Sequence, residues 1–252
     1  MLADKKLLGF NFINNTDLNF LLINKESNIT YGVQPLLALL AMWVTQDVVM
    51  NIFFSKKHIK GQEILTSMEG SVVLAPTHRS RWDGLVLTFA LGRRITNKDC
   101  RFMVTNPEMK GIQGWFLKRL GCFSIKQEAP SLLSLRYAVE LILSQNQLVI
   151  FPEGKINKKR KIIPFKQGLF RLASIANRKG ACVNIVPIGI AYSKINPKFR
   201  GEVALCIGKP IRIDDFSLSK IDNFNDQLRV RIEDAEKKAL ILVGRGLHHQ
   251  LK

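Results

Sequence analysis

The hydrophobic positions along the chain divide it into three regions. Residues 1–34 carry Asn side chains between short apolar runs, with no sustained period of 3.6 or 2, which indicates a loosely ordered leader. Residues 35–54 are a long apolar run. From residue 59 onward, short apolar runs bounded by Pro or Gly alternate with amphipathic stretches. These patterns predict a leader over residues 1–34, a membrane-associating helix over residues 35–58 and one catalytic-size domain over residues 59–252.

The apolar run at residues 35–54 would be about 30 Å long as a helix, enough to cross a hydrocarbon core. Asp47 in its second half argues against a full span, because a carboxylate near the bilayer centre costs roughly 2.5–3.5 kcal/mol on insertion scales. Trp43 and the basic run at residues 55–60 are typical of a segment anchored at the membrane interface. We therefore expect this helix to lie in or dip into the interface. A buried core helix is the alternative.

The alternating pattern after residue 59 predicts an α/β fold. Strands are expected at residues 71–75, 101–104, 122–125, 148–151, 184–191 and 202–207. Helices are expected near residues 82–91, 111–120, 131–144, 165–178 and 221–243. Strands that alternate with helices indicate a mostly parallel sheet flanked by helices on both faces.

The charge of the chain predicts an anionic partner. The formal net charge is +18, yet 46% of the residues are hydrophobic, which makes intrinsic disorder improbable. Nucleic acid, an anionic membrane surface and a phosphorylated substrate all fit this charge. The four cysteines are widely spaced and form no zinc-ligand pattern, so we expect small buried side chains and no metal. The N-terminal residues lack a secretory signal pattern, so we expect cytoplasmic residence.

The first candidate for chemistry lies where the predicted strand at residues 71–75 ends. Ligands bind just beyond the carboxyl ends of strands in such a sheet, and His78 stands at that position. Ser80 and Asp83 match the Ser-x-x-Asp start of a helix, which would keep His78 in the loop and place Asp83 in the first turn. The carboxylate can then orient the imidazole while the other ring nitrogen takes a proton from a hydroxyl. The alternative is a helix cap beside an ordinary loop histidine.

A second candidate follows the predicted strand at residues 148–151. Phe151, Pro152, Glu153 and Gly154 lead into a loop with six cations, which are Lys155, Lys158, Lys159, Arg160, Lys161 and Lys166. Cations beside a strand end, with Gly154 permitting close backbone approach, favour phosphate binding. A solvated basic loop is the alternative. Glu153 is expected either to orient one of these cations or to accept a hydrogen bond from a substrate hydroxyl.

Two shorter runs add candidates. Residues 121–126 are predicted to form a strand that ends in Lys126, for which an ordinary edge lysine is the alternative. In residues 185–192, Pro187 and Gly189 interrupt an otherwise buried strand, and proline in a strand is typical of an edge or a bulge. We expect such a kink to shape an apolar pocket.

In this order the runs resemble the glycerolipid acyltransferases of the 1-acyl-glycerol-3-phosphate acyltransferase type. The family's His-x4-Asp block is matched at residues 78–83, and its Gly-x-Phe strand with a final basic residue at residues 121–126. Its Phe-Pro-Glu-Gly block is matched at residues 151–154 and its Val-Pro-Ile block at residues 186–188. The sequence around His78 and Trp82 is most similar to the cyanobacterial or plastid-type branch.

The resemblance implies transfer of a fatty acyl chain from a thioester of acyl-carrier protein or coenzyme A to the hydroxyl of lysophosphatidate, giving phosphatidate in phospholipid biosynthesis. It implies that His78 is the general base, that Asp83 orients it, and that no metal, cofactor or covalent acyl-enzyme takes part. The substrate-binding residues expected on this basis are Arg79, Ser80, Lys126, Phe151, Pro152, Glu153, Gly154, Lys155, Arg160 and Pro187.

One departure from the family pattern concerns the acceptor. The family commonly continues Thr-Arg-Ser after Phe-Pro-Glu-Gly, whereas this chain continues Lys155, Ile156 and Asn157. Lys155, Lys158 or Arg160 is expected to replace the missing arginine, and a lysine offers a point charge rather than a bidentate fork. The acceptor therefore stays open among 1-acyl-glycerol-3-phosphate, glycerol-3-phosphate, another lysophospholipid and a neutral alcohol.

Other classes of function explain less of the sequence. A non-catalytic basic protein that binds nucleic acid or a membrane accounts for the charge, but the sequence has no nucleic-acid motif and only 8% aromatic residues. A serine hydrolase would need a Gly-x-Ser-x-Gly elbow, which is absent. We expect no nucleic-acid partner. We expect a monotopic or peripheral protein on the cytoplasmic face of an anionic membrane.

Overall fold

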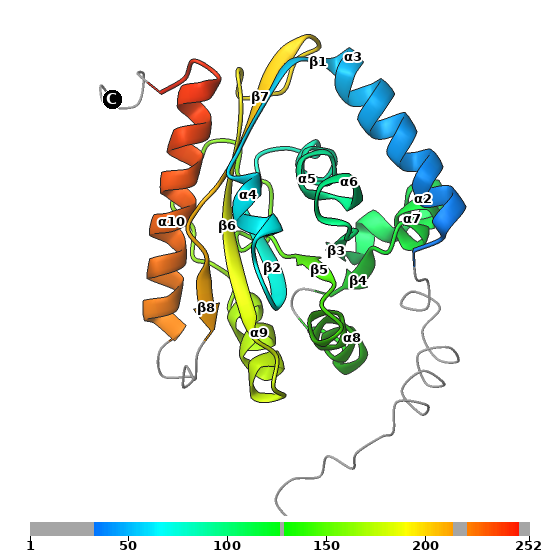
Figure 1. Cartoon of the computed structure of the whole chain (residues 1–252), viewed down its shortest axis with the longest axis vertical. Helices are drawn as coiled ribbons and strands as arrows, with labels where there is room; N and C mark the ends of the chain where they lie inside the picture. Colours follow the sequence, from blue (N-terminus) through cyan, green and yellow to red (C-terminus); the bar gives the residue numbers. More distant parts are fainter. Residues whose placement is uncertain (1–32, 127–128, 214–220, 247–252) are drawn as a thin grey trace, which may run out of the picture.

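The computed structural model describes residues 33–126, 129–213 and 221–246. The leader predicted over residues 1–34 lies outside the described residues, except for its last two, and stays a prediction. An eight-stranded sheet forms the centre of the described chain (Figure 1). Its strand order is β1-β7-β6-β2-β5-β3-β4, with β8 also paired to β6.

The strands follow the predicted α/β pattern. They are β1 (Phe54–Lys60), β2 (Ser71–Pro76), β3 (Cys100–Thr105), β4 (Phe123–Ile125), β5 (Gln147–Val149), β6 (Val183–Tyr192), β7 (Gly201–Ile207) and β8 (Ile211–Ile213). All strand pairings are parallel except those of β6 with β7 and with β8. The prediction of a mostly parallel sheet flanked by helices is confirmed.

Helices cover both faces of the sheet because the central strands are apolar on both sides. In β2, Val72 and Leu74 join one core with α5 (Asp83–Leu91), while Val73 and Ala75 join the other. The second core includes residues of α8 (Leu132–Leu143), α9 (Gly168–Arg178) and α10 (Ile221–Leu242). The shorter helices are α4 (Gln62–Thr66), α6 (Arg93–Thr96), the 3-10 turn η2 (Asn106–Met109) and α7 (Gly111–Arg119).

The basic run after the apolar segment is a strand, which the sequence pattern did not predict. Residues of β1 pair in parallel with β7 from Phe54↔Gly201 to Lys60↔Cys206. The sheet therefore begins at Phe54, before the predicted domain start at residue 59. An edge strand of this kind tolerates lysines, because its outer side meets solvent and its backbone pairs on one side only.

The kink expected at Pro187 is not present, so this expectation was wrong. Strand β6 runs without interruption and pairs with β2 along its first six residues. Pairing with β8 ends at Ile185 and pairing with β7 begins at Ile188, while the Pro187 carbonyl accepts from Gly208 on that side at 2.8 Å. In an extended strand the nitrogen and the carbonyl of one residue point to the same side. The nitrogen of Pro187 therefore faces the gap between β8 and β7, where no strand is paired. The missing N–H of proline thus removes no hydrogen bond between strands.

The apolar segment is one continuous helix that lies against the domain. It consists of α2 (Pro35–Met42), the π-helical η1 (Trp43–Val49) and α3 (Met50–Phe53). Gln46 Nε2 donates to the Thr88 carbonyl of α5 at 3.1 Å, and the Asp47 carboxylate pairs with Arg94 of α6 at 2.5 Å. Residues 36–53 are apolar enough to cross a membrane, with a mean hydropathy of 1.7, but only 11% of them are buried. The low burial excludes the alternative of a buried core helix.

Candidate active site

The histidine and the aspartate predicted to meet do so at the carboxyl end of β2. His78 stays in the loop, and its Nδ1 lies 2.9 Å from Oδ2 of Asp83, the first residue of α5. An ionised carboxylate only accepts hydrogen bonds, so this contact places the proton on Nδ1 and leaves the Nε2 lone pair available for a substrate proton. The imidazole is partly exposed and stacks on the Phe151 ring at 4.0 Å.

Asp83 is fully buried and is held by four donors. Its Oδ2 also accepts from the backbone N–H groups of Arg79 at 2.6 Å and Ser80 at 2.8 Å. Its Oδ1 accepts from the Tyr192 hydroxyl at the end of β6, at 2.6 Å. Burial, and then the Asp83 charge, raise the pKa of Tyr192 well above its usual value, so the phenol stays protonated and donates. This environment keeps the carboxylate in one position toward His78.

Of the two hydrogen bonds of the predicted capping box, only the one that the Ser80 N–H donates to Asp83 is present. The Asp83 carboxylate reaches back to the Ser80 N–H, as in a capping box. The Ser80 hydroxyl, however, accepts from the Trp82 N–H at 3.3 Å. Ser80 is buried and does not line the cavity described below, so the structure gives it a local backbone role.

Arg79 is enclosed by two buried carboxylates. Its Nη1 donates to both oxygens of Glu153 at 2.7 and 2.8 Å, and its Nε and Nη2 donate to the two oxygens of Glu236 at 2.5 and 2.9 Å. Burial alone would lower the pKa of the guanidinium, but the hydrogen bonds and charges of Glu236 and Glu153 outweigh it and raise the pKa. Arg79 is therefore committed to internal contacts and is not placed to bind a substrate.

Glu153 joins the second candidate run to the first. Besides Arg79, its Oε1 accepts from the His78 N–H at 3.2 Å. The Asn157 N–H donates to the His78 carbonyl at 2.7 Å, which seats the basic loop beside the histidine. Glu153 was expected to orient a cation of its own loop or to accept from a substrate hydroxyl. It does orient a cation, but that cation is Arg79 from the first candidate run. Glu153 is 5% exposed and contributes nothing to the cavity lining.

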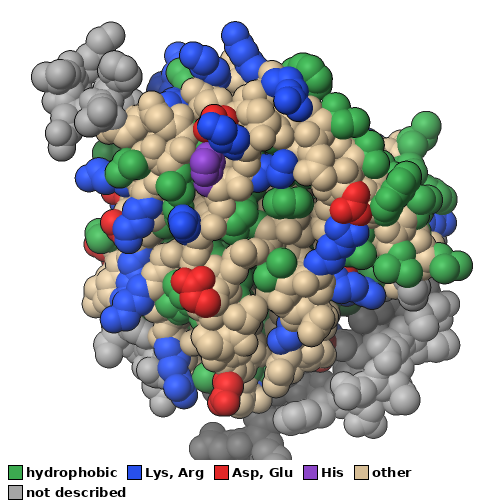
Figure 2. Space-filling model, turned by 45° about the horizontal axis from the view of Figure 1, so that its top comes forward, with side chains coloured by type: hydrophobic (Ala, Val, Ile, Leu, Met, Phe, Trp, Pro, Cys, Tyr) green, Lys and Arg blue, Asp and Glu red, His purple; other side chains and the backbone are tan. Residues whose placement is uncertain are grey.

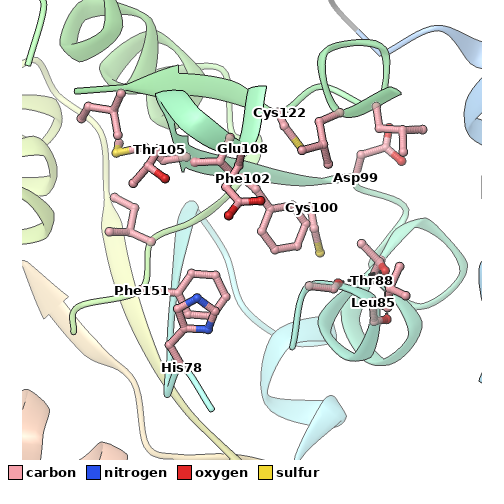
Figure 3. Close-up of a pocket in the computed structure, with 18 of the residues that line it drawn as sticks. His78, Leu85, Thr88, Asp99, Cys100, Phe102, Thr105, Glu108, Cys122 and Phe151 are labelled. Carbon is pink, nitrogen blue, oxygen red and sulfur yellow. Dashed lines mark hydrogen bonds between the residues drawn. The ribbon is translucent and has the colours of Figure 1, made fainter. Parts of the chain in front are cut away.

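A cavity of about 1210 Å³ opens beside His78. Figure 3 shows the His78 and Phe151 rings on one side, with Phe102 and Glu108 across from them and Leu85 and Thr88 of α5 along another wall. Buried apolar side chains from β3 and α9, together with the half-buried Leu85 of α5, line its interior. Its lining also includes four exposed cations, which are Arg81, Lys155, Lys166 and Arg171. The cavity therefore combines an apolar interior with a basic rim.

Two of the expected buried cysteines, Cys100 and Cys122, belong to this lining. Burial raises the pKa of each thiol to about 12, so both remain neutral near pH 7. They act as small apolar side chains in the wall.

The other predicted substrate-binding residues divide into two groups. Phe151, Gly154 and Lys155 line the cavity, and Gly154 adopts a φ of +67° that favours glycine. Arg79, Ser80, Lys126, Pro152, Glu153, Arg160 and Pro187 do not line it. Lys126 is exposed beyond β4, three strand positions from β2, or about 14 Å at normal strand spacing. Ile125, the last residue of β4, lines the cavity, so the expected contact of the adjacent Lys126 with the acceptor phosphate stays a prediction.

Two functional neighbours were missed by the sequence analysis, Tyr192 and Glu236. Glu236 reaches Arg79 because α10 packs directly on β6, where a Cβ at Gly189 would lie 2.1 Å from the Glu236 nitrogen. Gly189 is therefore needed for close helix approach rather than for a kink. The available signal was an acidic residue on the apolar face of the last predicted helix, between Ile232 and Ala239.

Comparison with known proteins agrees with this geometry. The Acyltransferase family model matches residues 56–191, which include β2, the His78 loop, the Phe-Pro-Glu-Gly run and all but the last residue of β6. The chain belongs to the Acyltransferase family. The predicted resemblance is thus confirmed at the level of the family.

This Acyltransferase-family chain is similar to proteins whose names give different acceptors, and to a solved structure. It is 29% identical over 193 residues to the chloroplastic 1-acyl-sn-glycerol-3-phosphate acyltransferase BAT2 of Brassica napus, covering 72% of this chain and 51% of the relative. It is 27% identical over 197 residues to the mitochondrial glycerol-3-phosphate acyltransferase 1 of Sus scrofa, covering 71% and 23%. The crystal structure of the 1-acyl-sn-glycerophosphate acyltransferase PlsC from Thermotoga maritima has the same fold, with a TM-score of 0.61, 19% identity and 79% of each chain covered.

The Acyltransferase-family chain spans about half the length of the Brassica protein and less than a quarter of the pig protein. The names of these relatives differ in the acceptor. The family assignment therefore identifies the class of chemistry but not the substrates.

Proposed function

We propose that this chain transfers a fatty acyl chain from a thioester of acyl-carrier protein or coenzyme A to the hydroxyl of 1-acyl-glycerol-3-phosphate, giving phosphatidate. The observation that carries the proposal is the His78–Asp83 pair, 2.9 Å apart, at a large apolar cavity with a basic rim. The pair supplies a base, the apolar interior suits a long acyl chain, and the rim suits a phosphate.

The proposed reaction is a direct attack of the acceptor hydroxyl on the thioester carbonyl. His78 Nε2 takes the hydroxyl proton as the new carbon–oxygen bond forms, and Asp83 stabilises the resulting imidazolium. Collapse of the tetrahedral intermediate breaks the carbon–sulfur bond, and the leaving thiolate takes the proton from Nε2. The ester and the thiol are the products, so atoms and charge balance. The thioester is already activated, and the proposed reaction needs no metal or cofactor.

Lys155 and Lys166 are the lysines that we propose for the acceptor phosphate. Both are exposed and line the cavity, whereas Lys158, exposed in the same loop, does not. Lys166 is fixed near the Phe-Pro-Glu-Gly run because its N–H donates to the Pro152 carbonyl at 2.8 Å. These two positions take over the role expected of the arginine that this chain lacks.

Replacing either lysine is expected to affect charged acceptors selectively. Lys155→Ala and Lys166→Ala should each raise the KM for lysophosphatidate by about tenfold or more, since a hydrogen bond to a charged group contributes about 1.5–3 kcal/mol. The KM for monoacylglycerol, which has no phosphate, should stay within about twofold. Lys158→Ala is the matched control. Equal effects of Lys155→Ala on both acceptors would contradict a phosphate contact.

An acceptor panel tests the proposed function as a whole. The purified chain is incubated with labelled acyl-carrier protein or acyl-coenzyme A thioesters and with lysophosphatidate, glycerol-3-phosphate, lysophosphatidylcholine or monoacylglycerol. We expect the highest kcat/KM for lysophosphatidate. The second candidate acceptor is glycerol-3-phosphate, which the similarity to the pig enzyme favours. Failure of every acceptor to remove the label from the donor would reject the acyltransferase proposal.

We also propose that the chain acts at the cytoplasmic face of an anionic membrane, where its acceptor resides. Along the N-terminal helix, Leu36, Leu40 and Trp43 are 84%, 57% and 56% exposed. Hydrophobic side chains gather at the right of Figure 2, on the side where this helix lies in Figure 1. A helix tied to the domain by Gln46 and Asp47, with an exposed apolar face, suits a position in the membrane interface.

A further inference from the structure

The connection between β6 and β7 exposes large apolar side chains among cations. Ile195 is 54% exposed and Phe199 is 64% exposed. Three cations in the same eight-residue connection, Lys194, Lys198 and Arg200, are also exposed. The described connection holds no acidic residue. Apolar side chains at a loop tip with cations beside them match the layered chemistry of a membrane interface.

This loop is attached to the end of the N-terminal helix. The Arg200 N–H donates to the Phe53 carbonyl at 2.7 Å, and the Phe199 ring lies 6.1 Å from the Phe53 ring in an edge-to-face contact. Figure 1 shows the β7 end of the loop and α3 meeting at the top of the molecule. Ile52, which precedes Phe53, is 56% exposed, so exposed apolar side chains extend along the helix as far as its contact with the loop.

The same contacts connect the loop to the active site. Phe53 stacks on Trp82 at 3.9 Å, and Trp82 immediately precedes Asp83. The rings of Phe53 and Trp82 therefore connect Phe199 to the start of α5. Contact of this loop with a bilayer would fix the position of the His78 side of the cavity relative to the lipid.

Positive charge is concentrated where the loop meets β1. Lys56 and Lys57 of β1 lie in the strand that pairs with β7, and Glu202 is the single carboxylate of the two described segments, residues 54–60 and 193–202. Burial, and then the nearby charge of Arg200, lower the pKa of Lys57. Crowded cations repel one another in the protein alone, and anionic lipid headgroups would relieve that repulsion. Lys and Arg side chains gather along the upper edge of Figure 2, where this end of the molecule comes forward.

We propose that the β6–β7 loop is a second membrane-contacting element, which inserts Ile195 and Phe199 below the headgroups of an anionic bilayer while Lys194, Lys198 and Arg200 bind the headgroups. This inference rests on the proposed membrane association and adds a second point of attachment to the N-terminal helix. Two attachment points fix the tilt of the domain as well as its distance from the lipid. An acidic carrier protein would meet the cations but would leave two apolar side chains exposed at the tip.

The first experiment reads insertion of the loop directly. An environment-sensitive fluorophore is attached to Phe199→Cys in the full chain with Cys182→Ser, since the other three cysteines are buried. Vesicles of 70% phosphatidylcholine and 30% phosphatidylglycerol are added, with and without a quencher in the upper acyl chains. We expect a blue shift and quenching. The matched control is Val230→Cys, which is 66% exposed on α10 and should show neither.

The second experiment measures binding by sedimentation with the same vesicles. Ile195→Ala/Phe199→Ala is expected to lower the partition coefficient by at least about tenfold, as the loss of two inserted apolar side chains predicts. The control pair Val230→Ala/Ile241→Ala, 66% and 62% exposed, should change it by less than about twofold. The two double variants and the parent chain should turn over short-chain, water-soluble substrates at equal rates.

The outcomes separate this inference from the proposed function. A parent chain that does not bind the vesicles would reject membrane association and the loop inference together, and its turnover of soluble substrates would still test the transferase. Binding of the parent chain without a response at residue 199, or an equal response at residue 230, would reject the loop inference alone. If Ile195→Ala/Phe199→Ala weakened the binding of acyl-carrier protein and left vesicle binding unchanged, the loop would be a carrier-binding site and our proposal would be overturned.

Discussion

His78→Ala is expected to lower kcat for acyl transfer by about 10²–10⁴-fold or more, because general-base catalysis contributes an effect of that size. The structure leaves no described side chain in position to replace the imidazole, since the Asp83 carboxylate behind it is buried and already accepts four hydrogen bonds. His78 is partly exposed, so its removal should change the unfolding midpoint little. Single-turnover kinetics with a labelled thioester and a urea melt measure the two quantities.

A second histidine provides the control for this prediction. His58 in β1 is half-buried, pairs with Glu202 at 3.3 Å and does not line the cavity. His58→Ala should keep kcat within about threefold of the parent. Activity of the His78→Ala chain at the level of the His58→Ala chain would reject His78 as the base.

Arg79→Met is expected to destabilise the fold by about 3–5 kcal/mol, the typical cost of leaving a buried charge without its partner. Arg79 lies between Glu153 and Glu236, which are 5% and 7% exposed, and it donates to both. Methionine fills a similar volume but leaves two carboxylates facing each other in a buried site. Urea unfolding measures the change in the free energy of unfolding, and we expect a lower midpoint with little change in slope.

Two further variants make this prediction specific. Arg81→Met changes the same residue type two positions along, where the side chain is 74% exposed and pairs with Glu108, so it should cost about 1 kcal/mol or less. Adding Glu153→Gln and Glu236→Gln to Arg79→Met removes both buried charges and should restore part of the lost stability. Equal unfolding energies for the Arg79→Met and Arg81→Met chains would show that the buried network does not hold the site together.

Much of the fold was predictable because its signals are local. Apolar runs bounded by Pro or Gly identified β2, β3, β4, β5, β6 and β7, with every strand end within two residues of the predicted one. A buried parallel strand must be apolar on both faces, so each such run is recognisable without its partners. Strand β1 was not recognisable in this way, because its residues Ser55–Lys60 are mostly polar and only its pairing with β7 makes it a strand.

The amino-acid sequence by itself determined that a histidine follows a buried strand, that an aspartate begins the next helix, and that a basic loop follows another strand end. These features depend on short-range spacing, and a five-residue separation at a helix start suffices to bring His78 and Asp83 together. The partners of these residues were decided only by tertiary structure. Tyr192 and Glu236 lie 109 and 157 residues away in sequence from the side chains they contact. The packing of α10 on β6 at Gly189 brings Glu236 to Arg79. Such long-range contacts depend on how whole elements pack, which no local spacing along the chain encodes.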